Sequence, residues 1–534
     1  MRNTSTPSAG PGRAPLAYGA ALLLMVFLGL AAVATAPLEQ GFTYALDDAY
    51  IHLAMARNLA EHGVWGVTRH GFSASSSSPL WTLLLAPTQA LLPAPVLAPL
   101  ALNLAFAFAL VGVAARMLRR DGVPDRPAMA VLTLLVVGAP LAPLVLSGME
   151  HVGHALVMLM LLERGSAWLV QDEPERRETL AVCALMTVAA GLRLESLALV
   201  PAAAAWLCLR GRPAHAALFA TAGLWPVAAF GAWSMAHGWG FLPEPVILKA
   251  ALPAGAEGMA RLEARLGVIT SNLRNTYFLG ILVPMAAALG WEIRRAWPAR
   301  AVALAAFAYV AVLQVTLGRT GWFFRYEAYL AVSGLMLVAS TALSPRARDR
   351  LTSAVRPAVA WSVCALVVAF LLARGARSHV DTPAACEEIH DQQRQMAGIL
   401  GEAEGLERVA INDIGAVAYF TDLEIVDLVG LATREIGDLR RAGTFDREHV
   451  GALLAERGVD WVVGYPQWVG PLVPSDWIEV GHWRLSRRPV VVAGDTVTFY
   501  ARDAEGAARL ADRLRAYAPR LPATVRSVVA GPPP

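Results

Sequence analysis

The chain contains 534 residues, of which 56% are hydrophobic and only 16% are charged. A typical soluble domain has about 45–50% apolar and about 25% charged residues, so this composition excludes an ordinary soluble enzyme and indicates a multi-pass membrane protein. The formal net charge of +3 argues against a nucleic-acid binder driven by attraction to phosphates, and the high hydrophobicity excludes a disordered chain.

The N-terminal segment predicts a first membrane span with a cytoplasmic tail. Residues 1–15 are mostly polar and include Arg2 and Arg13, and a long apolar run follows from Leu16 to Pro37. This run suits a transmembrane helix of about 20 residues and lacks a compelling signal-peptide cleavage site. Because basic flanks stay in the cytoplasm, we expect residues 38–79 to form a first loop on the outer face.

Further apolar runs predict about eleven spans in a transmembrane domain over residues 16–375. An N-terminus inside and a C-terminal domain outside require an odd number of spans. Two of the runs are long enough to be hairpins, with breaks at Pro93 and Pro95 in one and at Arg193 and Glu195 in the other. The runs cover about 80–116, 128–146, 149–163, 179–210, 214–236, 276–290, 299–317, 327–343 and 356–374.

Three clusters of arginines predict cytoplasmic loops near residues 119–126, 294–300 and 346–356. A true hairpin at 80–116 would place the first cluster on the wrong side of the membrane. Either one arm of that hairpin is re-entrant or the charge rule fails there.

After about Ala373 the composition changes, and residues 376–530 predict a soluble α/β domain on the outer face. Charged residues become frequent and the apolar runs shorten. Residues 407–413, 423–431 and 461–465 predict strands, and 447–460 an amphipathic helix. Residues 490–501 predict a hairpin around Gly494 and Asp495.

Two adjacent acids, Asp47 and Asp48, stand just outside the first predicted span. His52 follows Asp48 by four residues, so both are expected on one helix face. Ionisable groups beside membrane spans are costly and suggest function. The alternative is structural, with Asp47 as an N-cap and Asp48 favouring the helix dipole.

The sequence resembles the C-type integral-membrane glycosyltransferases, the GT-C fold, and more narrowly the arabinofuranosyltransferase group and its bacterial relatives. DDAYIHLAMARNLAEHG followed by SPLWTLLLA carries most of this resemblance. Weaker matches are SGMEH (147–151), RLES (193–196), PEPVILK (243–249), RYEAYL (325–330) and DIGAVAYF (413–420). His151 replaces a threonine of the family pattern, RLES lacks its proline and glycine, and PEPVILK lacks its asparagine and threonine.

The resemblance implies sugar transfer from a polyprenyl-phosphate donor in one inverting displacement. Such a reaction needs one base for the acceptor hydroxyl, and Asp47 is the expected general base with Asp48 as its helper. The alternative role for Asp48, or for the pair, is to hold a divalent cation such as Mg²⁺, Mn²⁺ or Ca²⁺.

The leaving phosphate needs positive charge, and the candidates are Lys249, Arg193 and Arg325. Lys249 is the only lysine in a chain that otherwise uses arginine. The remaining candidates are expected to contact substrate: His52, Glu150, Glu195 and Tyr326. Structural alternatives exist for several of these residues. Arg193 and Glu195 can stabilise each other in a buried place, Glu150 can sit at the water interface, and Arg325 can be an interfacial anchor.

The expected function is therefore an inverting glycosyltransferase of the bacterial inner membrane, acting on a cell-envelope glycan or glycolipid. Arabinofuranose is one candidate sugar, and mannose or glucose is equally compatible with the motifs. A transporter or flippase for lipid-linked sugars is the alternative that the spans alone allow, but the chain shows no repeated halves. A non-catalytic scaffold is the third alternative.

Overall fold

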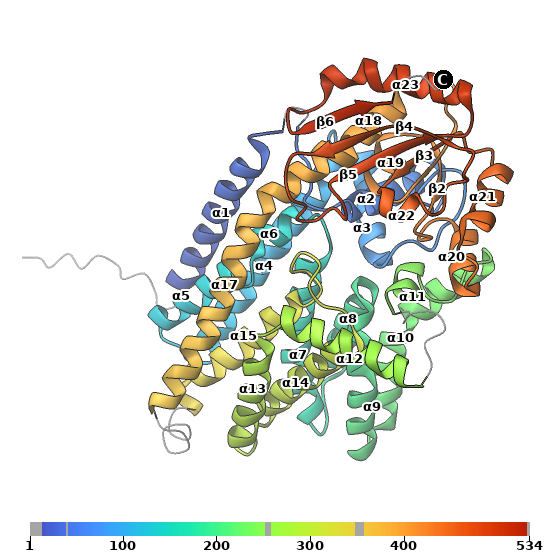
Figure 1. Ribbon diagram of the computed structural model, residues 1–534. Coiled ribbons are helices and arrows are strands. Elements are labelled where there is room, and N and C mark those ends of the chain that lie inside the picture. Colours follow the sequence, from blue (N-terminus) through green and yellow to red (C-terminus); the bar gives the residue numbers. More distant parts are fainter. Residues whose placement is uncertain (1–12, 39–40, 251–257, 348–356, 531–534) are drawn as a thin grey trace, which may run out of the picture. The chain divides into compact units, whose positions relative to one another are not determined.

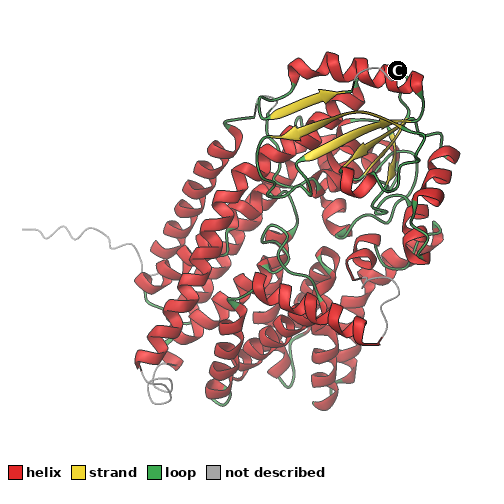
Figure 2. Ribbon diagram, viewed as in Figure 1, coloured by secondary structure: helices red, strands yellow, loops and turns green. Residues whose placement is uncertain are grey.

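A computed structural model describes residues 13–38, 41–250, 258–347 and 357–530. Helices dominate, and the described strands form one six-stranded sheet (Figure 2). The chain forms two compact units, each assembled from three segments. The first unit comprises Met1–Ala31, Leu100–Val227 and Leu262–Val380, and the second comprises Ala32–Pro99, Ala228–Arg261 and Asp381–Pro534.

Figure 1 labels the helices in chain order. Up to residue 250 they are α1 (Ala14–Thr35), α2 (Asp48–His62), α3 (Pro79–Leu91), α4 (Ala98–Arg120), α5 (Asp125–Thr133), α6 (Leu141–Leu146), α7 (His151–Val170), α8 (Arg176–Leu192), α9 (Leu199–Leu209), α10 (Pro213–Ala236) and α11 (Glu244–Ala250). The later helices are α12 (Gly258–Asn275), α13 (Leu279–Ile293), α14 (Pro298–Leu317), α15 (Ala328–Leu343), α17 (Pro357–Ile389), α18 (Gln395–Gly401), α19 (Gly415–Phe420), α20 (Arg434–Ala442), α21 (Arg447–Glu456), α22 (Pro466–Val469) and α23 (Ala504–Tyr517).

By length and composition, six helical stretches among the described residues can cross a membrane, so the chain is a multi-pass membrane protein. They are Ala14–Thr35, Pro95–Arg120, Asp125–Leu146, Pro213–Ala236, Pro298–Leu317 and Ser362–Gly401. The bent pair α12 and α13, with an angle of 83° between its arms, would add a seventh. The predicted count of eleven is not confirmed.

Both predicted breaks in the long apolar runs are present. The run at 80–116 divides into α3 and α4, and the run at 179–210 divides at Arg193, whose backbone is extended. Helix α3 has 13 residues, fewer than the about 20 that a span needs. The run at 80–116 therefore contains one helix of spanning length rather than two.

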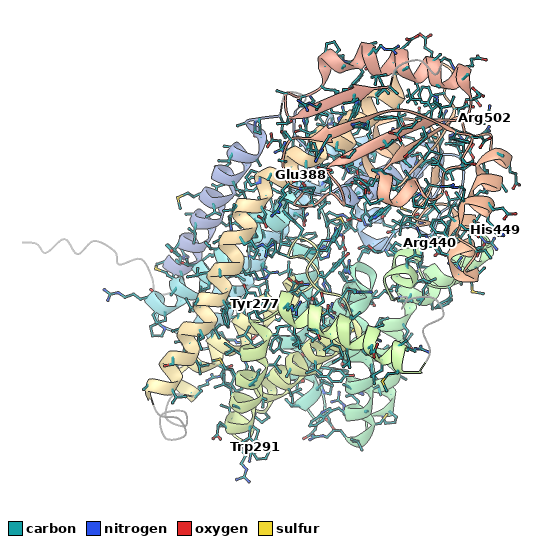
Figure 3. All side chains as sticks on the ribbon, viewed as in Figure 1. Tyr277, Trp291, Glu388, Arg440, His449 and Arg502 are labelled. Atoms are coloured by element: carbon teal, nitrogen blue, oxygen red, sulfur yellow. The ribbon has the colours of Figure 1, made fainter. Side chains whose placement is uncertain are left out.

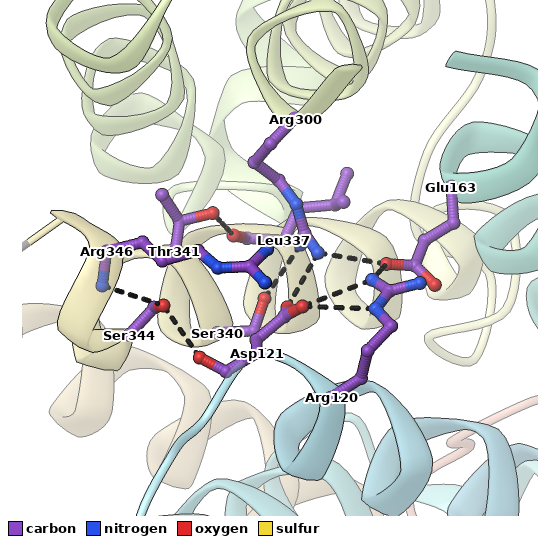
Figure 4. Close-up of polar contacts among 9 residues, drawn as sticks. All are labelled: Arg120, Asp121, Glu163, Arg300, Leu337, Ser340, Thr341, Ser344 and Arg346. Carbon is purple, nitrogen blue, oxygen red and sulfur yellow. Dashed lines mark hydrogen bonds and ion pairs between the residues drawn. The ribbon is translucent and has the colours of Figure 1, made fainter. Parts of the chain in front are cut away.

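A charge network centred on the buried side chains of Arg300 and Asp121 links four helices of the first unit (Figure 4). Arg300 of α14 donates to Asp121 at 2.6 Å and to Glu163 of α7 at 3.0 Å. Arg120, at the end of α4, donates to Glu163 at 2.6 Å, and Arg300 also donates to the hydroxyl of Ser340 in α15 at 2.8 Å. Because the Asp121 side chain has no exposed surface, its charge depends on these partners.

The sheet of the second unit combines parallel and antiparallel strands in the order β2-β1-β3-β5-β4-β6. Strand β1 pairs in parallel with β2 and β3, and the other pairings are antiparallel. The strands are β1 (Arg408–Ile411), β2 (Glu424–Asp427), β3 (Trp461–Gly464), β4 (Ile478–Leu485), β5 (Thr496–Ala501) and β6 (Val525–Val529). Helix α19 connects β1 to β2, and α20 and α21 connect β2 to β3.

The predicted strands at 407–413, 423–431 and 461–465 correspond to β1, β2 and β3, and the predicted helix at 447–460 corresponds to α21. Strand β2 ends early because the carboxylate of Asp427 accepts backbone N–H groups of Val429 and Ala432, both at 2.8 Å, which turns the chain. The second unit thus contains the small α/β sheet domain that the composition change predicts.

The predicted hairpin over 490–501 is wrong. Only β5 forms there, and its partners are β3 and β4. The N–H groups of Val490 and Val491 instead donate to Glu388, at 2.8–2.9 Å to its nearest oxygens. Glu388, labelled in Figure 3, lies on α17. A carboxylate distant in sequence therefore takes the donors that a hairpin would have used.

Residues of the predicted first outer loop pack against helix α19 and the loops of the α/β domain within the second unit. Helix α2 contacts α3 and α19. Arg57 of α2 donates to the carbonyls of Tyr419 and Thr421, at 2.8 and 2.9 Å, where α19 ends. Ser75 donates to the carbonyl of Leu431 at 2.7 Å. These contacts join two parts of the chain that lie more than 350 positions apart.

Candidate functional site

Asp47 binds the N-terminus of a helix far away in the sequence. Its carboxylate oxygens accept the backbone N–H groups of Gly415 and Ala416 at 2.7 and 2.8 Å. These groups open α19, and N–H groups at a helix N-terminus attract negative charge. Asp47 precedes α2 but makes no side-chain bond to its first turn, so the predicted N-cap role is wrong for that helix.

Glycine is the residue that this contact requires at position 415. A Cβ atom there would lie 2.1 Å from the carbonyl oxygen of Asp47 and 2.7 Å from its carboxylate. The close approach of the two backbones therefore depends on the missing side chain.

Two further carboxylates share the electrostatic environment of Asp47. Asp413 precedes α19 by two residues, and Asp48 is the first residue of α2. Asp413 accepts a hydrogen bond from the Tyr465 hydroxyl at 2.5 Å and from the Gln393 amide at 2.8 Å. We call Asp47, Asp48 and Asp413 the carboxylate cluster.

Burial and like charge raise the proton affinity of this cluster. Burial, followed by the negative charge of Asp413, raises the pKa of Asp47 to about 7, although the two N–H bonds oppose the change. Part of the residue stays accessible to solvent. Burial also raises the pKa of Asp413. A carboxylate with a pKa near neutrality can both accept and release a proton at physiological pH.

Sequence reasoning missed Asp413 and Tyr465. Asp413 lies in the DIGAVAYF segment that supports the family resemblance, and it is the last residue of the predicted strand at 407–413. Tyr465 is likewise the last residue of the predicted strand at 461–465. The carboxyl ends of neighbouring parallel strands meet at one edge of a sheet, and that rule was the available signal.

His52 lies one turn after Asp48, as predicted, and its imidazole joins α2 to α3. The Nδ1 atom is 2.9 Å from the Thr82 hydroxyl, which is itself 3.1 Å from the Ser76 hydroxyl. Both His52 and Thr82 are buried. Substrate contact by His52 stays a prediction.

Five of the other predicted site residues come together within the first unit. Arg193 donates to Glu150 at 2.9 Å and to Glu195 at 2.5 Å, and its guanidinium lies 5.5 Å from the centre of the Tyr326 ring. Arg325 lies 5.1 Å from the same ring centre, on which guanidinium groups pack favourably. These residues come from the segment before α7, the break after α8 and the segment before α15.

Arg193 already balances two carboxylates, which is the mutual stabilisation that sequence reasoning proposed as its structural alternative. Together Arg193, Glu150 and Glu195 carry a formal charge of −1, so Arg193 adds little positive charge for a phosphate. Arg325 is almost fully buried beside this group.

The turn before Arg325 has an unusual backbone. Trp322, Phe323 and Phe324 are consecutive non-glycine residues with positive φ angles of 44°, 60° and 62°. This conformation costs about 1–2 kcal/mol per residue, so other contacts must hold it. Arg374 donates to the carbonyl of Phe324 at 2.6 Å and to Glu327 at 2.9 Å, which fixes both ends of the segment that carries Arg325.

Lys249 lies near the C-terminal end of α11, and its side chain is outside the described residues. Its predicted contact with phosphate stays a prediction.

The carboxylate cluster fits a divalent cation poorly. Within the described ranges, no group of three or more His, Cys, Asp or Glu side chains is arranged to hold a metal ion. Both oxygens of Asp47 already accept N–H groups, whose positive ends would face a cation.

Comparison with known proteins supports the fold. Residues 387–500 match a domain of unknown function, DUF8728, and no curated protein matches the chain. The crystal structure of ArnT from Cupriavidus metallidurans in the apo state is similar, with a TM-score of 0.50 and 15% sequence identity. That likeness covers 91% of this chain and 99% of the other.

The crystal structure of the same ArnT bound to undecaprenyl phosphate has a TM-score of 0.49 and 14% identity, covering 91% of this chain and 98% of the other. The likeness to the apo structure shows that the chain has the GT-C fold, as the sequence resemblance predicted. The narrower resemblance to the arabinofuranosyltransferase group is not confirmed.

Proposed function

We propose that this protein is an inverting membrane glycosyltransferase that moves a sugar from a polyprenyl-phosphate donor to a cell-envelope glycan or glycolipid. The observation that carries the proposal is the carboxylate cluster, in which Asp47 has a pKa of about 7. The GT-C fold supports the class of reaction, and the apolar helices support a lipid-linked donor. In this proposal the second unit lies on the outer face of the inner membrane.

The chemical step is a single displacement at the anomeric carbon. The acceptor hydroxyl oxygen forms a new bond to that carbon while its proton passes to the carboxylate of Asp47. The bond between the anomeric carbon and the phosphate oxygen breaks, and polyprenyl phosphate leaves with the electron pair. Each oxygen of Asp47 keeps a second lone pair besides the one facing an N–H group, so the carboxylate can still accept the proton.

In this proposal the other predicted residues orient the acceptor and stabilise the leaving group. Asp48 orients the acceptor hydroxyl beside Asp47. Arg325 and Lys249 meet the negative charge that develops on the leaving phosphate. Arg193 holds Glu150 and Glu195 in position, and Tyr326 packs against both arginines.

The proposal is tested by following release of polyprenyl phosphate from the purified full chain in lipid nanodiscs. The substrates are polyprenyl-phosphate arabinofuranose, mannose and glucose, each combined with a cell-envelope glycan extract. We expect release from one donor by the wild type and at least about a hundredfold slower release by Asp47→Asn, which lacks the proton-accepting carboxylate. Asp512→Asn, an exposed position on α23, is the matched control and should behave as the wild type.

Two outcomes would contradict the proposal. The first is an absence of release by wild type under conditions where donor binding is measured directly. The second is release by Asp47→Asn at the wild-type rate, which would show that Asp47 is not the base.

A further inference from the structure

A small cavity lies at the carboxyl edge of the three parallel strands of the second unit. Its volume is about 360 Å³, which is ample for one sugar residue. Asn412 and Leu428 line it and directly follow β1 and β2, while Trp468 comes from α22, just beyond β3. The walls are otherwise mostly aliphatic.

The topology makes this edge a favoured binding position. Strand β1 has β2 on one side and β3 on the other, so the chain reverses its direction of travel across the sheet at β1. In open α/β sheets, ligands bind in the crevice outside the carboxyl ends of the strands at such a reversal. The cavity is in that place.

Arg440 supplies an uncommitted positive charge to the cavity. Its Nη2 donates to the carbonyl of Leu428 at 3.1 Å, and its guanidinium lies 3.9 Å from the centre of the Phe445 ring. Among the described residues, no ion pair includes Arg440, and its Nε atom is buried without a hydrogen-bond partner. Arg440 is labelled in Figure 3 and belongs to α20.

Asp427, the carboxylate whose charge acts on Arg440, does not form an ion pair with it. Asp427 interacts with the guanidinium only at longer range, and its oxygens accept backbone N–H groups of Val429 and Ala432. Leu428 and Phe445 therefore hold the guanidinium in place, and some of its N–H donors have no partner among the described residues. A planar guanidinium with free donors suits a carboxylate or a phosphate, which it can bind through two parallel bonds.

Trp468 provides the second element of a sugar site. Nearly half of this residue's surface, 47%, is exposed, while its ring packs edge-on against Tyr465 with 5.4 Å between the ring centres. An exposed, supported aromatic face is a good surface for the C–H face of a sugar ring. Asn412 connects the cavity to the carboxylate cluster, because its side chain interacts with Asp413.

We infer that this cavity binds an anionic sugar residue of the acceptor, with the acidic group on Arg440 and the ring on Trp468. Its role as an acceptor subsite rests on the proposed function, whereas sugar binding itself does not. The acidic group is a uronic-acid carboxylate or a phosphate ester, and both present the same chemistry to a guanidinium.

The test measures binding to the full chain in nanodiscs by saturation-transfer NMR and tryptophan fluorescence. The probes are methyl glucuronide, glucose 6-phosphate, neutral methyl glucoside and inorganic phosphate. We expect one of the two acidic sugars to bind at least about tenfold more tightly than methyl glucoside. The better of the two acidic sugars identifies the acidic group.

Three variants and one control locate the binding. Arg440→Gln should abolish the preference for the acidic sugar, and Trp468→Ala should weaken both acidic and neutral sugars by about tenfold. Val429→Phe fills the cavity without removing either contact and should prevent binding. Arg502→Gln, a partly exposed arginine paired with Asp460 elsewhere in the second unit, should bind as the wild type. Thermal midpoints confirm that each variant is folded.

The inference is overturned if no sugar binds to folded wild type, or if folded Arg440→Gln and Val429→Phe bind as the wild type does. Binding of inorganic phosphate as tight as that of glucose 6-phosphate would overturn the sugar part. The transfer assay is separate. Sugar binding without transfer would contradict the proposed function but not the sugar site. Transfer at the wild-type rate by all three variants would contradict only the role of the cavity as an acceptor subsite.

Discussion

Replacing Asp47 by asparagine should change how the stability of the protein depends on pH. In the folded chain, burial and the charge of Asp413 raise the pKa of Asp47 from 3.8 to about 7. The folded state therefore binds more protons than the unfolded state between about pH 4 and about pH 7. The stabilisation from this proton is fully present below about pH 4 and is lost as the pH rises through about 7.

The size of the effect follows from the same numbers. Each pH unit across this window lowers the free energy of unfolding by at most about 1.4 kcal/mol, which gives at most about 4 kcal/mol over the whole window. Solvent reaches part of Asp47, and Asp413 shares the proton, so the observed change should be smaller. The asparagine side chain has no titrating group. The N–H groups at 415 and 416 bond to different oxygens of Asp47, so in asparagine one of them would face an NH2 group, which does not accept.

The assay is thermal unfolding of the full chain in detergent, followed by intrinsic fluorescence at several pH values between about 5 and about 8.5. We expect Asp47→Asn to be less stable than wild type at the acidic end and to approach or exceed it at the basic end. Asp512→Asn, on an exposed face, should follow the wild-type curve. Parallel curves for wild type and Asp47→Asn would refute the assignment of a raised pKa to Asp47.

The structure makes three further predictions. In the transfer assay, kcat/KM should rise with pH through about 7 as Asp47 loses its proton. Asp413→Asn should shift this rise to lower pH, because it removes a negative charge that raises the pKa of Asp47. A rise at the same pH in the variant would show that Asp413 does not influence the base. Arg300→Met should lower the free energy of unfolding by about 3–5 kcal/mol, because Asp121 stays buried with less compensation. A loss below about 0.5 kcal/mol, as expected at an exposed site, would show that the network adds little. Gly415→Ala should raise hydrogen exchange in the peptide containing residues 415–416, since the new Cβ would overlap the carbonyl of Asp47; unchanged protection would contradict the close approach.

Local patterns in the sequence were enough for several features of the fold. Hydropathy identified the membrane class, and prolines and Arg193 marked the helix breaks. Short apolar runs identified the three parallel strands, because buried strands have a local signature. Strand β4 carries alternating apolar residues, but the bulge between Glu479 and Gly481 interrupts the alternation. The predicted hairpin does not form because Glu388 accepts the backbone N–H groups that it would have used.

The residues of the candidate site also fall into a part that the sequence identified and a part that it did not. The sequence singled out the Asp47–Asp48 pair, the five residues that meet around Arg193 in the first unit, and the GT-C fold. It did not show that Asp47 caps a helix 368 positions away, or that Asp413 shares its environment.

The physical reason is the range of the interactions. Periodicity, breaks and charge pairs are set by neighbours within a few turns, so one sequence reveals them. The carboxylate cluster forms only when segments from the two ends of the chain pack into one unit. The raised pKa of Asp47, the glycine needed at 415 and the unpaired Nε of Arg440 depend on that packing, so the tertiary structure alone decided them.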